Sequence, residues 1–402
     1  MRLYRSIVLD IIGKVIHEEV GKGKYLALFE DAFCRYVGTK YAVAIGSAGV
    51  GLNMVLDSMN LKKGSEIIMS AYASKHLVSL LESGGFKAKL VDVGRESFNI
   101  NPDLIEQALT PDSRVILTTH MFGLPSDMEK ITAIAKKYDL LVIEDCRQAL
   151  GAVFKGRKVG SLSNAALFSF ETDKLINTFG GAVVTTDSQQ LAEQLRQRIK
   201  ILNRSTPKFR NSLKVLNKIF FGLVRYIFIN SPFFPLWAYV LSLKWPDRLV
   251  ALYYERNSHR YLRFTDLQAL MGLRQLSLLE VQNVRRQRIA AEYGKWFLNS
   301  PVIPQKDNAD VRREYCSYVV NLDAAGLNLE RIREQMMYYG VDCGLKGEIG
   351  GDCFFDPVNQ DSCPNGLYIY SSNLQLPMSD ELTDKNVAFI ARVVKKAVLK
   401  YV

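Results

Sequence analysis

A carboxylate and an amine stand out as side chains that could act on a substrate: Asp145 and Lys174. Residues 141–145, LVIED, are a run of branched apolar residues that ends in two acids, which is typical of a buried parallel strand with a functional group at its carboxyl end. Residues 166–170 read as a second buried strand, and Lys174 follows in the loop before a third, at 180–186. The acid and the amine can therefore meet at one edge of a sheet.

This pairing suits pyridoxal phosphate (PLP) chemistry. A lysine amine forms a Schiff base with the cofactor aldehyde, and a carboxylate beside the pyridine nitrogen keeps that nitrogen protonated, so that the ring accepts electrons from a substrate carbanion. On spacing alone a plainer alternative stays open, in which Asp145 is a strand-end or helix-capping carboxylate and Lys174 is a solvated loop cation.

Three segments around these residues resemble, in order and spacing, the signature of the DegT/DnrJ/StrS family of sugar aminotransferases: EDCRQALGA, KGRKVGSLSNAALFSFETDK and GGAVVTTD. Other family-like segments extend this likeness over most of the chain. The resemblance implies the aspartate-aminotransferase type of PLP fold, with Lys174 as the Schiff-base lysine and Asp145 at the pyridine nitrogen. It also implies that Gln148 contacts the cofactor ring and that Ser169 contacts its phosphate.

A glycine-rich turn, GSAGVG, separates a short buried strand from a helix. Such a turn presents backbone N–H groups at a helix N-terminus, which suits a phosphate. The order is GxxGxG rather than GxGxxG, and Glu66 begins the next strand instead of ending it, so a dinucleotide is disfavoured, while a tight turn without a ligand stays open. The family has Gly-Thr where this chain has Ala48-Gly49, so the resemblance places the cofactor phosphate at Ser47, Ala48 and Gly49 with one side-chain contact fewer.

Other positions depart from the family. Where the family places an aromatic residue over the cofactor ring, this chain has Ser74. Tyr72 or His76 could take over the stacking, but Tyr72 could equally belong to the core and His76 be an ordinary helix residue. Tyr261 stands where the family has an asparagine that reaches the partner subunit's cofactor phosphate, and residues 344–363 stand where it has a histidine-containing substrate segment. These changes leave the substrate and the reaction itself open.

The order of elements predicts the fold class. Strands and helices alternate between residues 40 and 185, which predicts an α/β fold with a mostly parallel sheet and helices on both faces; the resemblance makes it a three-layer fold with a seven-stranded type of sheet. The 402 residues, 48% of them hydrophobic, suffice for two cores. We expect a helical arm at 1–20, a large PLP-binding domain at 21–203, an insertion at 204–254, and a bridging helix with a small α+β domain at 255–402.

The C-terminal part is expected to begin with one long helix over 263–297, whose apolar residues recur every three and four positions. Strands are expected at 316–322 and 366–372, and helices at 329–340 and 384–400.

The net charge of +11 is concentrated in one stretch. From Gln194 to Pro246 there are ten Lys or Arg residues and no Asp or Glu, so the rest of the chain is nearly neutral and no nucleic-acid partner is expected. The second half of 204–254 is rich in aromatic residues, but an asparagine and two prolines interrupt it, which disfavours a membrane span. Two interpretations stay open for this insertion: peripheral contact with an anionic membrane, or a protein interface or cap over the active site.

Cysteine usage and missing motifs narrow the class of protein. The six cysteines form no CxxC pair and no secretory signal precedes them, so reduced thiols in the cytoplasm are expected. HExxH, GxSxG and P-loop patterns are missing from the sequence, and no metal is expected.

The sequence thus predicts a PLP-dependent aminotransferase. The resemblance implies a keto sugar linked to a nucleotide as acceptor, glutamate as donor, a homodimer, and a pathway to a surface polysaccharide or glycosylated metabolite. The enzyme is expected in the cytoplasm, with possible contact at the inner face of the membrane. Two alternatives are a different PLP reaction on an unusual substrate, and an inactive family member that serves as scaffold or regulator.

Overall fold

The computed structural model describes residues 23–171, 174–204, 263–307, 310–322, 328–345, 353–354 and 362–400. The predicted arm at 1–20 and the predicted insertion beyond Arg204 lie outside these residues. Within the described part, no helix is both long and apolar enough to cross a membrane.

A central sheet carries strands in the order β1-β10-β9-β6-β5-β2-β4. Strand β10 is antiparallel to both of its neighbours, whereas every other pairing in this sheet is parallel. The strands are β1 (Tyr41–Ile45), β2 (Glu66–Ser70), β4 (Lys87–Val91), β5 (Ser113–Thr119), β6 (Leu141–Asp145), β9 (Ala165–Ser169) and β10 (Ala182–Thr186). The predicted mostly parallel sheet is confirmed.

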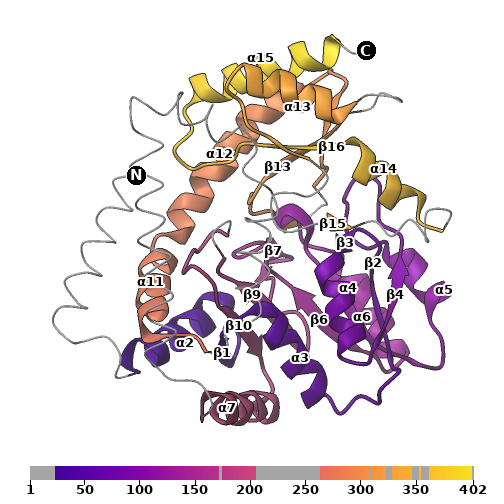
Figure 1. Cartoon of the computed structure of the whole chain (residues 1–402), viewed down its shortest axis with the longest axis vertical. Helices are drawn as coiled ribbons and strands as arrows, with labels where there is room; N and C mark the ends of the chain where they lie inside the picture. The colour runs from indigo at the N-terminus through magenta and orange to yellow at the C-terminus, as the bar shows by residue number, and fades with distance from the viewer. Residues whose placement is uncertain are drawn as a thin grey trace, which may run out of the picture.

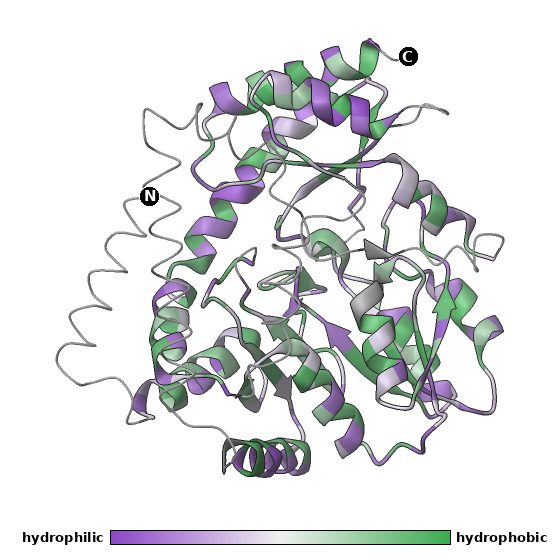
Figure 2. Ribbon diagram, viewed as in Figure 1, coloured by the Kyte–Doolittle hydropathy of each residue, from purple (hydrophilic) through white to green (hydrophobic). Residues whose placement is uncertain are grey.

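Helices cover both faces of this sheet, which gives the three predicted layers (Figure 1). One face packs against α3 (Ala48–Ser58), α4 (Lys75–Ser83) and α7 (Gln189–Arg204). The other packs against α2 (Lys24–Val37), α5 (Ile105–Ala108), α6 (Met128–Lys137) and α11 (Asp266–Leu276). Figure 2 shows α7 as an amphipathic helix, and its buried side includes Leu191 and Leu195.

Helix α2 is joined to α11 by a hydrogen bond between residues that lie 240 positions apart. Phe29 and Phe33, four positions apart, are fully buried on one side of the helix. Gly38, at φ +89°, ends the helix in the left-handed conformation that glycine favours. Its N-cap residue, Gly23, has no side chain that could cap the first turn, and the carboxylate of Asp266 in α11 accepts the N–H of Leu26 at 2.9 Å.

The small domain has its own sheet and core. Helix α12 (Leu279–Phe297) leads to an antiparallel sheet in the order β11-β13-β16-β14, which packs against α13 and α15. Its elements are β11 (Val302–Pro304), β13 (Tyr318–Leu322), α13 (Leu329–Tyr338), β14 (Gly344–Leu345), β16 (Asn373–Leu376) and α15 (Asp384–Leu399). The predicted α+β small domain is therefore confirmed.

Short elements complete the fold. They are β3 (Ala73–Ser74), η1 (Pro102–Leu104), η2 (Met121–Gly123), β7 (Val153–Phe154), β8 (Arg157–Lys158), β12 (Val311–Arg312), β15 (Cys353–Phe354) and α14 (Pro364–Ser372).

Two predicted elements were wrong. The single helix over 263–297 is two helices, because α11 ends at Leu276 and α12 begins at Leu279. Between them, the Ser277 hydroxyl donates to the carbonyl of Arg274, a local bond that competes with continued helical pairing.

The predicted strand at 366–372 is helix α14. Pro364 occupies its first turn, where a proline is preorganised for a helix. The Asp92 carboxylate accepts the N–H groups of Asn365 at 3.1 Å and Gly366 at 2.8 Å, so a distant acid caps the helix and stabilises it. The true strand, β16, follows directly after Ser372.

Candidate active site

The carboxyl ends of the parallel strands bring the predicted site residues to one edge of the sheet. Asp145 ends β6 and Ser169 ends β9. Both Ser169 and Ile45 pair with Ala182, the first residue of the antiparallel strand β10. The turn at Ser47 and the Lys174 connection therefore lie at the same edge as Asp145, the edge at which open α/β sheets bind ligands.

Lys174 lies in the connection from β9 to β10 and is half-buried. The backbone N–H of Lys174 donates to the backbone carbonyl of Glu171 at 3.1 Å. The base of the connection is closed by backbone bonds from Phe170 to Gly181 and from Thr178 to Phe170, each 3.0 Å. The lysine is thus presented on a connection with a fixed base.

Two glutamines of α11 hold this connection, and sequence reasoning did not find them. Gln275 donates to the carbonyl of Asn177 at 2.8 Å and accepts the N–H of the same residue at 2.9 Å. Gln268 is buried and donates to the carbonyls of Thr178 and Gly180, at 3.2 and 2.9 Å. Because both lie about 90 positions or more along the chain from the loop, no local signal identifies them.

Asp145 is buried and paired with Arg147. Arg147 Nε donates to Asp145 Oδ1 at 2.7 Å and Nη2 donates to Oδ2 at 2.6 Å. Burial alone would raise the pKa of Asp145, but the charge and hydrogen bonds of Arg147 outweigh burial and lower it. Asp145 is therefore an anion that is ready to face a cation. Sequence reasoning found the acid and missed the arginine two positions away.

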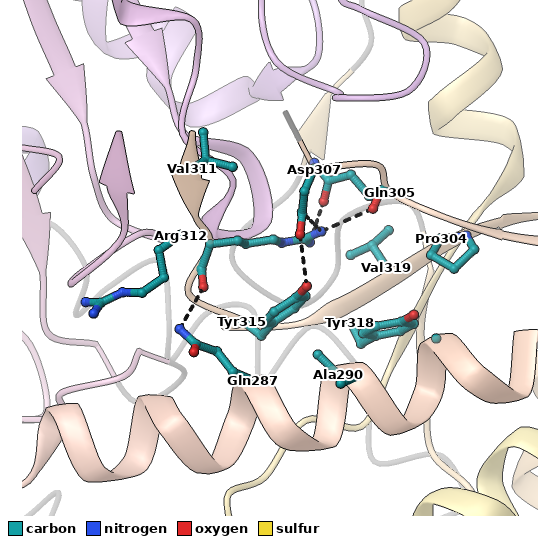
Figure 3. Close-up of a pocket in the computed structure, with 13 residues that line it drawn as sticks. Gln287, Ala290, Pro304, Gln305, Asp307, Val311, Arg312, Tyr315, Tyr318 and Val319 are labelled. Atoms are coloured by element: carbon teal, nitrogen blue, oxygen red, sulfur yellow. Dashed lines mark hydrogen bonds and ion pairs between the residues drawn. The ribbon is translucent and has the colours of Figure 1, made fainter. Parts of the chain in front are cut away.

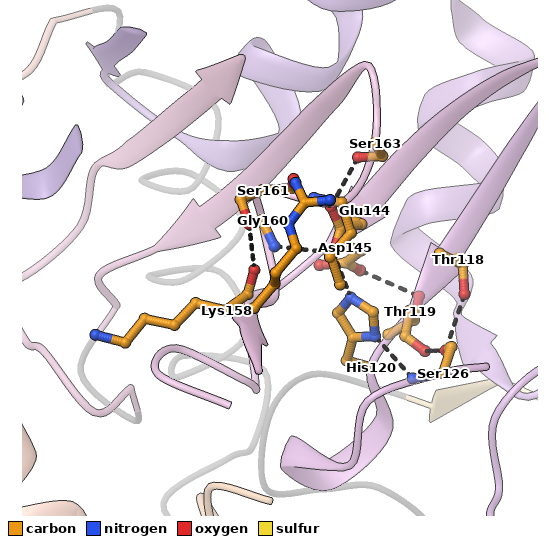
Figure 4. A network of polar contacts seen from close by, with 12 residues as sticks. Thr118, Thr119, His120, Ser126, Glu144, Asp145, Lys158, Gly160, Ser161 and Ser163 are labelled. Carbon is orange, nitrogen blue, oxygen red and sulfur yellow. Dashed lines mark hydrogen bonds and ion pairs between the residues drawn. The ribbon is translucent and has the colours of Figure 1, made fainter. Parts of the chain in front are cut away.

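The neighbouring acid, Glu144, has a structural role. Its carboxylate accepts the N–H groups of Gly160 and Leu162 and the hydroxyl of Ser163, and it contacts Nε2 of His120 at 3.1 Å (Figure 4). His120 Nδ1 accepts the N–H of Ser126, so Nε2 carries the proton that is donated to Glu144.

His120 directly follows β5, has no exposed surface and bonds to the backbone N–H of Ser126. His120, Glu144 and Cys146 also offer three buried ligating atoms within 4.8 Å of one another. Since four donors already occupy the Glu144 oxygens, this cluster fastens the loop around Gly160 rather than presenting lone pairs to a metal.

The start of α3 suits a phosphate. Ser47 is the N-cap, and its hydroxyl accepts the N–H of Val50 at 3.3 Å while keeping its own hydrogen as a donor. Ala48 and Gly49, in the first turn, are partly exposed, and first-turn N–H groups have no partner within their own helix. The helix N-terminus adds favourable partial charge for an anion.

The residues predicted to contact the cofactor ring differ in how deeply they are buried. Gln148 is half-buried, and its Oε1 accepts the N–H of Phe122 at 2.7 Å. Tyr72 has no exposed surface, packs in a cluster with Phe122, and accepts a hydrogen bond from Asn373 at 2.6 Å on its hydroxyl. The core alternative for Tyr72 therefore matches its position. The side chains of Ser74 and His76, like all of Tyr261, lie outside what the structure describes.

A cavity of about 380 Å³ lies beside the site, between α12 and the start of the small domain (Figure 3). Its wall includes Arg313, which is buried, donates to the carbonyl of Phe122 at 3.1 and 3.2 Å, and lies over the ring of Tyr315. Phe122 thus bonds to Gln148 through its N–H and to Arg313 through its carbonyl, so it links the sheet edge to the cavity wall.

The donor set at the sheet edge fits PLP in chemical type. The set consists of the half-buried lysine Lys174, a buried anionic carboxylate on Asp145, and a phosphate-compatible helix start at Ser47. Arg147 competes with this fit, because its guanidinium already occupies the carboxylate.

Comparison with known proteins agrees with this chemistry. Residues 11–217 and 250–395 match the model of the DegT/DnrJ/EryC1/StrS aminotransferase family. The chain is 28% identical to the spore coat polysaccharide biosynthesis protein SpsC of Bacillus subtilis, over 97% of this chain and 96% of that protein. It is also 28% identical to MJ1066 of Methanocaldococcus jannaschii, over 97% and 94%.

Solved structures show the same fold. The PLP form of the sugar aminotransferase Spr1654 of Streptococcus pneumoniae has a TM-score of 0.76 at 18% identity, covering 99% of this chain and 97% of that one. DesV of S. venezuelae has a TM-score of 0.74 at 21% identity, covering 99% and 95%. The resemblance and the fold class expected from the sequence are both confirmed. The chain belongs to the DegT/DnrJ/EryC1/StrS aminotransferase family, and it is an aminotransferase.

Proposed function

We propose that this aminotransferase uses PLP bound at Lys174 to transfer an amino group between glutamate and a keto sugar linked to a nucleotide. The observation that carries the proposal is the meeting of Asp145, Ser47 and the Lys174 connection at one sheet edge. The name of SpsC supports the polysaccharide pathway. The neighbour DesI (TM-score 0.74, 20% identity), whose structure was determined with its TDP-sugar product, supports the substrate class. The product then serves a surface polysaccharide or a glycosylated metabolite.

Each residue has a part in this proposal. PLP, when bound, supplies the electron sink for the substrate carbanion. With PLP bound, Lys174 would hold the cofactor covalently, and its amine would serve as base and acid for the proton of the substrate carbon. Asp145 keeps the ring nitrogen protonated, Gln148 contacts the ring, and the helix start at Ser47 together with Ser169 takes the phosphate.

The cofactor part is tested by absorbance and labelling. Purified protein incubated with PLP should show a visible band that borohydride removes, and mass spectrometry should then find the label on the peptide that contains Lys174. Lys174→Ala should lose the label, whereas Lys158→Ala, which removes a lysine paired with Glu280, should keep it. A protein that stays colourless with excess PLP would contradict the proposal.

The reaction is tested with a panel of amino-sugar nucleotides. Loss of the visible band together with release of a keto sugar supports transamination in the proposed direction. A different product points to another PLP reaction, which the substitutions at Ser74, Tyr261 and 344–363 favour. A protein that binds PLP but reacts with no amine, glutamate included, supports the scaffold or regulator alternative.

We further propose a homodimer that contacts the inner face of an anionic membrane through 204–254. The support is the charge of this stretch, where seven Lys or Arg residues and no Asp or Glu lie from Arg204 to Pro246, since each basic residue near an anionic surface contributes about 1 kcal/mol. Binding to anionic vesicles should weaken at high salt and on combining Trp237→Ala with Arg225→Glu. If that double variant binds vesicles normally but dissociates a dimer, the segment is a subunit interface instead.

A further inference from the structure

The Asp145 carboxylate is already saturated with donors. Oδ1 accepts Arg147 Nε at 2.7 Å and the Arg147 backbone N–H at 3.2 Å. Oδ2 accepts Arg147 Nη2 at 2.6 Å and the Thr119 hydroxyl at 3.3 Å. Two oxygens offer about four lone-pair sites, so a further N–H donor must displace one of these contacts.

The guanidinium is the donor best able to leave. Thr119 ends β5 and pairs with Asp145 across the sheet, and the Arg147 N–H is fixed by the backbone two residues on. The Arg147 side chain, in contrast, is 26% exposed and can rotate toward solvent, while Asp145 is 2% exposed and cannot follow it. A protonated ring nitrogen is itself a cation, so it would take the place of the guanidinium and the carboxylate would stay paired.

We propose that Arg147 competes with the cofactor's ring nitrogen for Asp145, so that the guanidinium must leave this carboxylate when the cofactor binds. This inference rests on the proposed function of Asp145 and Lys174. Its consequence is that cofactor affinity is reduced by the strength of a bidentate ion pair.

Other roles for Arg147 predict other changes in cofactor affinity when this residue is removed. If Arg147 were a ligand for the cofactor, its removal would weaken binding. If Arg147 were only a structural partner of Asp145, its removal would change folding stability without a specific change in cofactor affinity. The sign of one measured change therefore separates the three roles.

The experiment is a binding titration of the apoprotein with pyridoxamine 5′-phosphate, which has the ring and phosphate of PLP but no aldehyde for Lys174. Wild type, Arg147→Met, Asp145→Asn and the double variant form a cycle that isolates the coupling of the two residues. Lys155→Met is the control for loss of one positive charge, because Lys155 is exposed and paired with Glu129. Circular dichroism and thermal melts confirm that each variant is folded.

Arg147→Met should lower the dissociation constant about tenfold, which is the lower range for a hydrogen bond to a charged group. The same substitution should give no tightening in the Asp145→Asn background, and Lys155→Met should leave affinity at the wild-type value. Weaker or unchanged binding by Arg147→Met, or equal tightening in both backgrounds, overturns the inference while the proposed function stands. If wild type binds neither pyridoxamine phosphate nor PLP, both are overturned.

Discussion

Glu314 should make the stability of this enzyme fall as the pH rises through neutrality. Its side chain has no exposed surface, and among the described residues its Oε2 has no hydrogen-bond partner. Oε1 lies 3.3 Å from Arg312 Nε and from Gln287 Nε2. Burial raises the pKa of Glu314 from 4.5 to about 7, and the nearby arginine offsets only part of the increase.

The pKa shift of Glu314 determines the direction and the size of the change in folding stability with pH. In the unfolded chain Glu314 loses its proton near its ordinary pKa, whereas in the folded chain it keeps the proton to about pH 7. Between these values the folded state binds more protons, so folding stability decreases as the pH rises. A shift from 4.5 to about 7 corresponds to about 3 kcal/mol at most.

Glu314→Gln keeps the shape of the neutral carboxyl and removes its ionisation. Melting temperatures measured at pH 5, 6, 7 and 8 should be similar for variant and wild type at pH 5, and the variant should then be the more stable by an increasing margin. Other titrating groups are common to both proteins and cancel in the difference. The expected margin at pH 8 is about a few degrees Celsius.

Glu280→Gln is the matched control. Glu280 also contacts Arg312, but its side chain is 46% exposed. Burial would raise its pKa, and the neighbouring Tyr36, Lys158 and Arg312 lower it instead. Its substitution should therefore reduce stability more at pH 7 than at pH 4. A difference between wild type and Glu314→Gln that stays constant from pH 5 to pH 8 would refute the reasoning.

Two further predictions concern backbone and capping. In Gly181→Ala, the new Cβ would lie 2.4 Å from ring atoms of Phe264, at a residue whose φ is +96°. Denaturant unfolding should therefore show a loss of stability of about 1–3 kcal/mol. Gly340→Ala, at φ +76° with no atom within 4 Å of the new Cβ, isolates the backbone cost and should lose less stability. Asp92→Ala removes the carboxylate that caps α14 and should cost about 1–2 kcal/mol in the same assay, while Asp103→Ala, which removes only an exposed ion pair with Lys130, should cost less than about 1 kcal/mol. Equal losses within either pair would contradict its prediction.

The strands of the central sheet could be predicted because their burial on both faces leaves continuous apolar runs. The apolar run at 366–372 was misread for the same reason, since a short apolar run fits a strand and a buried helix equally. Asp92 decides between them, and it lies 273 and 274 positions before the N–H groups that it caps. A contact between residues so far apart in the chain cannot be predicted from the local sequence pattern.

Some residues of the candidate site could likewise be predicted from the sequence, and others could not. Asp145 and Lys174 were identifiable because their chemistry and their strand-end positions coincide. Arg147 was visible two positions from Asp145, but periodicity does not say toward which group a long side chain turns. The glutamines of α11 are ordinary helix residues until the fold places them on the Lys174 connection.

The bond between Asp266 and Leu26 means that α2 cannot be completed until late in the synthesis of the chain. The acid that completes the first turn of α2 is translated 240 residues after that turn. At about 5–20 residues per second, α2 waits about 12–48 s for this partner and for the apolar surface of α11, while Phe29 and Phe33 remain without part of their packing. A nascent chain released before Asp266 would lack the α11 part of this packing, so early truncation products of this enzyme should bind chaperones more than the complete chain does.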